Sequence, residues 1–164
     1  MTSTVAQNYE QLSYGGSASQ WRGQHRQIIS DGVATRQLLA KEAGALCLFD
    51  LAAGVTYTLP PAPLAGMTFE FMTSVTITSN SAKAITSAAT EFLLGAIALV
   101  NDGATTAESF LANGTTIRSV NGNGTTTGGI AGDRFRVTAI STTQWLVEGV
   151  MINSGTAATP FATS

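Results

Sequence analysis

Short runs of alternating apolar and polar residues, each closed by turn residues, constrain this chain more than any other feature. Val55, Tyr57 and Leu59 share one face of such a run, and proline follows at once. Because residues two apart lie on the same side of a strand, this alternation indicates strands with one buried face. About ten runs of this kind follow from residue 35 onwards, a pattern typical of all-β sandwiches and barrels. We therefore expect an all-β domain, built as a β-sandwich or as a jelly-roll or barrel-like fold.

The clearest predicted strands lie near the C-terminus. Phe135 and Val137 alternate with Arg134 and Arg136, and the next run places Trp145 on an apolar face. A large aromatic residue in such a position is expected to be core. Two arginines on an exposed strand face either protect the strand against unwanted pairing or grip carboxylates of a partner. Both alternatives remain open at this stage.

Two stretches are harder to assign. Residues 91–100 are apolar enough for either a strand or a short buried helix, and periodicity does not decide between them. The stretch 103–132 is rich in turn residues, with Asn-Gly at 113–114, 121–122 and 123–124. Asn-Gly favours two-residue hairpin turns, because both central residues of a type I′ turn need positive φ. These pairs therefore predict hairpins.

The chain divides into three parts. Residues 34–152 hold the predicted β-domain, and residues 153–164 form a Gly-, Thr- and Ala-rich tail that is either disordered or docks Phe161 on a neighbour. Residues 1–33 are polar and show no lasting period, so we expect an extended N-terminal arm. Its spaced anchors could bind a partner, or tuck into the chain's own core. The candidate partner-binding residues there are Tyr9, Leu12, Tyr14, Trp21 and Arg22.

The charge composition excludes several partners. Only 11% of residues are charged and the net charge is −2, whereas typical domains are about 25% charged. There is no basic surplus for nucleic acid, no apolar stretch long enough for a membrane span, and no pattern predicting a signal peptide. A surface with so few charges is poorly protected against association. We therefore expect part of it to be covered by other chains.

The residue types needed for catalysis are scarce. His25 is the only histidine and lies in the predicted arm, and Cys47 is the only cysteine, in an apolar setting that favours an inert, buried thiol. One of each cannot form a zinc cluster, and no phosphate loop or dinucleotide fingerprint is present. Paired carboxylates of a small glycosidase remain the weakest alternative. We expect no enzyme activity, no cofactor and no metal.

Two segments resemble the β-domains of phage virion proteins. Residues 59–71 read LPPAPLAGMTFEF, similar to an LP-x-G-x-x-F/Y-x-F pattern, and GDRFRV at 132–137 with QWLVEG at 144–149 resembles the ending of the same domains. With TTTGG at 125–129, the match covers roughly residues 45–150. A small chain with an arm and without long fibre repeats looks most like a capsid decoration, or cement, protein of tailed bacteriophages.

That resemblance implies a function as well as a fold. It implies a homotrimer on the capsid exterior, assembled from protein made in the host cytoplasm, which bridges subunits of the major capsid protein and can contact neighbouring decoration trimers. It carries over no catalytic residue. The alternative is a receptor- or carbohydrate-binding domain of a phage tail fibre or spike, which exposed aromatic residues in loops would favour.

Overall fold

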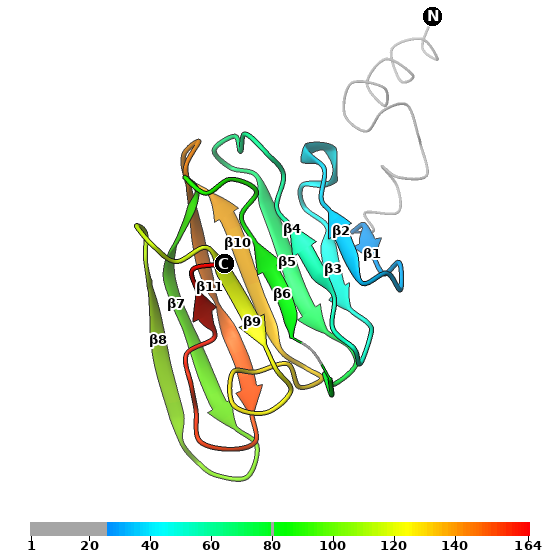
Figure 1. Ribbon diagram of the computed structural model, residues 1–164, viewed down its shortest axis with the longest axis vertical. Helices are drawn as coiled ribbons and strands as arrows, with labels where there is room; N and C mark the ends of the chain where they lie inside the picture. Colours follow the sequence, from blue (N-terminus) through cyan, green and yellow to red (C-terminus); the bar gives the residue numbers. More distant parts are fainter. Residues whose placement is uncertain (1–25, 80) are drawn as a thin grey trace, which may run out of the picture.

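The computed structural model describes residues 26–79 and 81–164, which form two β-sheets packed face to face (Figure 1). One short 3-10 turn, η1 (Ala40–Glu42), accompanies the strands. Among the described residues, no helix has the length and apolar character that crossing a membrane would need. The strands are β1 (Ile28–Ile29), β2 (Thr35–Gln37), β3 (Leu46–Phe49), β4 (Thr56–Thr58), β5 (Thr68–Thr73), β6 (Ala82–Ile85), β7 (Phe92–Asn101), β8 (Ala107–Asn113), β9 (Ser119–Gly122), β10 (Arg134–Ala139), β11 (Gln144–Asn153) and β12 (Phe161–Ala162).

The predicted all-β sandwich is confirmed, and both of its sheets are mixed. The larger sheet has seven strands in the order β1-β3-β5-β10-β11-β7-β8, and the smaller has five in the order β12-β9-β6-β4-β2. From β1 to β7, successive strands alternate between the two sheets, so β1, β3 and β5 are parallel neighbours, as are β2, β4 and β6. This first half of the domain therefore winds as a coil between the layers.

Aromatic residues fill the centre of the sandwich. Phe71 stacks on Phe135 across the β5–β10 pair with ring centroids 5.0 Å apart, and Phe49 and Tyr57 close the cluster. Trp145 is fully buried, as predicted. Each of these residues lies on the inward face of its strand, which alternation in the sequence had indicated for all of them except Phe49.

The described part of the segment predicted as an arm, residues 26–33, does not form an arm. Ile28 and Ile29 form β1, which pairs in parallel with Leu46 and Cys47 of β3. Arg26 already contacts the domain, because its side chain donates to the carbonyl oxygen of Gly44 at 2.7 Å. Residues 26–33 therefore belong to the β-domain.

The predicted C-terminal tail is also part of the sandwich. Phe161 lies opposite Val120 in the antiparallel β12–β9 pair and is buried in the chain's own core. Its aromatic ring does not dock on a neighbour, because the domain itself covers it. The expected boundary at residue 153 thus marks the end of β11 rather than the end of the fold.

Residues 92–101 form a strand, β7, which resolves the earlier ambiguity. The three Asn-Gly pairs do not form two-residue hairpins. Asn113-Gly114 spans the end of β8, where the chain crosses to the other sheet. Asn121-Gly122 lies within β9, and Asn123-Gly124 opens a loop. In that loop the Asn123 side chain accepts hydrogen bonds from the backbone N–H groups of Thr125 and Thr127, at 3.0 and 3.1 Å.

Candidate functional site

The candidate site is the outer face of the seven-stranded sheet, the side turned away from the five-stranded sheet. Alternation places Phe135 and Val137 of β10 in the core, so Arg134 and Arg136 lie on this outer face. Strand register extends their rows across the sheet. One row runs from Glu70 through Arg136 and Glu148 to β7 and then to Leu111 of β8.

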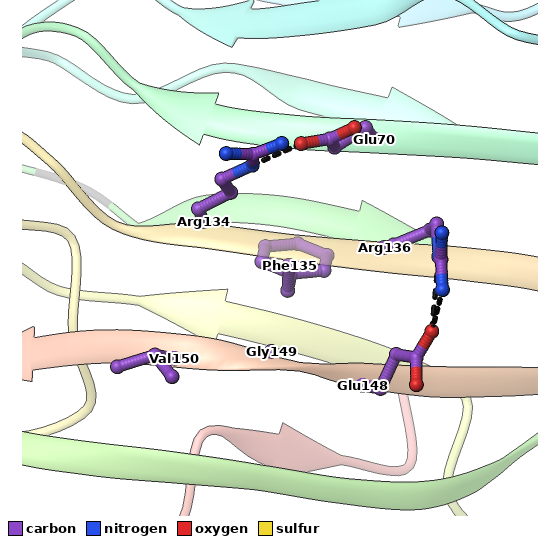
Figure 2. Close-up of a pocket in the computed structure, with 7 residues that line it drawn as sticks. All are labelled: Glu70, Arg134, Phe135, Arg136, Glu148, Gly149 and Val150. Carbon is purple, nitrogen blue, oxygen red and sulfur yellow. Dashed lines mark hydrogen bonds and ion pairs between the residues drawn. The ribbon is translucent and has the colours of Figure 1, made fainter.

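Charged side chains occupy the half of the outer face built by β5 and β10, with Glu148 of β11 at its border. Glu70 is buried between Arg26 and Arg134 and pairs with both. Figure 2 shows its pair with Arg134, and the pair of Arg136 with Glu148. Burial opposes ionisation of Glu70, but the hydrogen bonds from Arg26 and Arg134 outweigh it and hold the pKa of this carboxyl below its ordinary value. Glu70 is therefore the anionic centre of a structural ion-pair network.

A shallow hollow lies above this charged half. It measures about 500 Å³ and is lined by Glu70, Arg134, Phe135, Arg136, Glu148, Gly149 and Val150 (Figure 2). Arg134 uses its Nε for Glu70, and its side chain is still 68% exposed. A guanidinium presents a fork of donors, so Arg134 can bind a second carboxylate at the rim of this hollow.

Apolar side chains occupy the other half of the outer face. Leu146 of β11 lies beside Leu94 of β7, and Leu111 of β8 lies beside Ala96. Leu111 is 76% exposed, more than any other large apolar side chain that the structure describes. We call this surface the apolar half; its exposed large residues are Leu94, Val100, Leu111, Leu146 and Val150. Contiguous exposed apolar surface of this kind marks sites of protein association.

The structure brings two of the sequence-predicted site residues together and reassigns their role. Arg134 and Arg136 lie on β10, which is paired on both sides, by β5 and β11. They therefore do not protect an open edge. The carboxylates that they bind in the structure, those of Glu70 and Glu148, belong to the same chain, and the binding of a partner's carboxylates stays a prediction. The predicted arm residues Tyr9, Leu12, Tyr14, Trp21 and Arg22 lie outside the described residues.

Several partners in the site were not identified from the sequence. Glu70 could have been noticed as a single charge between Phe69 and Phe71, because a carboxylate in a largely apolar strand needs a cationic partner. The pairing of β5 with β10 that supplies Arg134 is not readable from the sequence. The apolar half was missed altogether, because it joins strands that are far apart in the chain.

Two other groups that could be reactive, the Cys47 thiol and the Asp133 carboxyl, are buried in the domain. Desolvation by burial raises the pKa of the Cys47 thiol to about 12, so this thiol is not nucleophilic at neutral pH. Asp133, in the GDR segment, is buried and accepts hydrogen bonds from the backbone N–H groups of Gly129 and Ile152, which ties the loop before β10 to β11. Within 26–79 and 81–164, no three His, Cys, Asp or Glu side chains lie close enough together to hold a metal ion.

The sequence was also compared with known proteins. No protein-family model matches it, and no curated protein matches it.

Proposed function

We propose that this chain is a structural protein of a tailed-phage virion that binds the outer surface of the capsid and bridges major capsid protein subunits. The observation that carries this proposal is the divided outer face, where an exposed apolar half adjoins a charged half. Interfaces between proteins likewise combine apolar surface with polar and charged surface. The resemblance to phage decoration proteins supplies the identity of the partner.

The two halves would do different work on a capsid subunit. Burying Leu94, Leu111 and Leu146 against the shell removes apolar surface from water and contributes most of the affinity. Arg134 and Arg136 orient the contact, because charge complementarity at an interface favours one docking geometry over others. Both halves lie on one continuous hydrogen-bonded sheet, so we expect binding to require little ordering of the docking surface.

The N-terminal segment supplies the second contact in this proposal. The segment holds residue types that dominate protein interfaces, namely Tyr9, Tyr14, Trp21 and Arg22. Leu12 adds an apolar side chain among them. Residues 1–25 could extend up to roughly 80 Å, far enough to reach a second capsid subunit. A chain attached through both its segment and its sheet, in a trimer, binds at several points at once, so modest contacts sum to firm attachment.

Sedimentation with undecorated capsids of the phage that encodes the chain tests the proposal. The full chain is expected to co-sediment with the capsids, and Val100→Glu is expected to weaken binding at least tenfold, because it places a charge in the apolar half, between Ile152 and Ala107. Val75→Glu is the matched control, since Val75 is 41% exposed, close to the 40% of Val100, and lies in the bend after β5, outside the strands of the sheet. Failure of the full chain to bind would overturn the proposed function. If the two variants bind capsids equally well, the outer face is not part of the capsid contact.

The segment is tested separately by deleting residues 1–25. The truncated chain keeps Arg26 and β1, so circular dichroism should show an intact sandwich. Binding to capsids should fall strongly, because several anchors are lost together. A truncated chain that binds as tightly as the full one would place the whole attachment on the outer face.

The alternative function, a receptor- or carbohydrate-binding domain of a tail fibre, gains no specific support. Among the described residues, every Phe, Tyr and Trp is buried or half-buried, so none offers an open ring on which a sugar could stack. Trp145 in particular lies in the core.

A further inference from the structure

We propose that β8 is a site of self-association, at which two copies of this chain pair antiparallel, edge to edge. The four sheet edges in the described structure are unequal. β1 and β12 have two residues each and β2 has three, whereas β8 runs over seven residues, Ala107–Asn113. Short edges are one way in which proteins avoid unwanted strand pairing. Only β8 lacks that protection.

The backbone of β8 is open along its outer side. The β7–β8 ladder is bounded by hydrogen bonds from Asn101 N–H to the Thr106 carbonyl (3.1 Å) and from Gly114 N–H to the Leu93 carbonyl (2.8 Å). Because hydrogen-bonded pairs alternate in antiparallel sheets, even-numbered residues of β8 bond to β7. Ala107, Ser109, Leu111 and Asn113 thus turn their backbone N–H and C=O groups outward, where an added strand would satisfy them.

The side chains of β8 favour a second copy as the occupant. Glu108 is the only charged residue of the strand, so the edge carries little repulsion and no lysine or proline that would block pairing. An antiparallel pair centred on Leu111 places each Leu111 beside its counterpart and buries the most exposed large apolar side chain of the described structure. In that register Glu108 lies opposite Gly114 of the other copy, so no like charges meet.

The proposed pair has consequences for assembly. It is isologous, because the same strand of each copy meets itself across a twofold axis. The two seven-stranded sheets become one continuous sheet, and their outer faces lie on the same side. Within a trimeric protein this contact would join one trimer to the next. The β8 pair forms without a capsid. The pairing can therefore be refuted while capsid binding is confirmed, and capsid binding can be refuted while the pairing is confirmed.

Cysteine cross-linking in the full chain tests the pairing. Directly opposed residues of a hydrogen-bonded antiparallel pair have Cα atoms about 5.5 Å apart, within the range that a disulfide spans. Leu111→Cys should therefore form a covalent dimer under mild oxidation at micromolar concentration. Leu64→Cys is the matched control, because Leu64 is 67% exposed but lies in a loop. The buried Cys47 does not interfere.

We expect Leu111→Cys to dimerise at least tenfold faster than Leu64→Cys. Adding Ser109→Pro should return the rate to that of Leu64→Cys, because the Ser109 N–H points away from β7 and proline is tolerated at such edge positions while it blocks an added strand. Equal dimerisation rates for Leu111→Cys and Leu64→Cys would overturn the proposal. This holds whether β8 is then unpaired on its outer side or paired with a strand of another protein. The proposal would also be overturned if the chain with both Leu111→Cys and Ser109→Pro kept its melting temperature and cross-linked as fast as Leu111→Cys alone. The comparison of the two cysteine variants does not depend on the proline variant.

Discussion

Trp145→Ala tests whether the sandwich is held together where the structure indicates. The indole is 0% exposed, lies 6.4 Å from the ring of Phe69 between centroids, and belongs to the strand at the middle of the β10–β11–β7 group. Replacing a large buried aromatic residue with alanine costs about 3–5 kcal/mol of unfolding free energy, because it loses apolar burial and leaves a cavity. Domains of this kind have only about 5–15 kcal/mol in total.

The size of the effect can be refined with a second variant. Trp145 Nε1 is buried and has no hydrogen-bond partner among the described residues, so the indole N–H is itself a cost in the folded state. Trp145→Phe keeps a ring and removes this N–H, and should therefore lower the unfolding free energy by less than about 2 kcal/mol.

Urea unfolding followed by far-ultraviolet circular dichroism measures both variants. At about 2–4 °C per kcal/mol for a chain of this size, Trp145→Ala should also melt about 6–20 °C below the parent protein. A Trp145→Ala variant within about 1 kcal/mol of the parent would refute the core assignment. A Trp145→Phe variant as unstable as Trp145→Ala would refute the account of the unpaired N–H.

Three further predictions concern single residues. Cys47 should resist iodoacetamide at pH 8 in the folded protein and react in urea, because burial raises its pKa to about 12; mass spectrometry of the native sample that shows rapid alkylation would contradict this. Glu70 has a lowered pKa in the folded state, so its stabilising contribution is present above the ordinary pKa of 4.5 and is lost as the pH falls through the folded value. In the Glu70→Gln variant the unfolding free energy should therefore fall less steeply at acid pH than in the parent. An unchanged acid dependence would contradict the stabilising role of the ion pairs with Arg26 and Arg134. Gly95→Ala should destabilise the protein strongly, because a Cβ there would lie 2.0 Å from the carbonyl oxygen of Val147 and φ is +137°; a melting temperature equal to that of the parent would contradict the close β7–β11 approach.

The inward and outward faces of strands were predictable because alternation is a local property. Phe69 and Phe71 of β5, and Phe135 and Val137 of β10, are buried as expected, whatever strands lie beside them. The alternation depends only on the period of two, which the backbone imposes on every strand.

The pairing of strands was not predictable, because local signals mark a turn without showing which sheet the next strand joins. Asn113-Gly114 stands at the end of β8, but β9 then enters the other sheet, so the predicted hairpin does not form. Parallel neighbours such as β3 and β5 are separated by a strand of the opposite layer, so their contact leaves no mark in adjacent residues. The short β1 and β12 fall below the length at which a period can be recognised.

The candidate site was predicted in part for the same reasons. Arg134 and Arg136 were placed on an exposed face by alternation alone, whereas their partners depend on register between distant strands. The open edge was not predicted because few residues of β8 are buried. Only Phe110 and Ala112 face inward and are half-buried or buried, and the other residues of the strand are exposed. The strand therefore shows little apolar alternation in the sequence.

Electron cryomicroscopy of the tailed-phage virions to which the proposed function assigns the chain tests the central claim most directly. We predict density for a two-layered β-sandwich on the capsid exterior, with the outer face of its seven-stranded sheet against major capsid protein subunits. Capsids assembled without the chain should lack that density. Density for the sandwich at the tail tip, or virions that do not contain the chain at all, would contradict it.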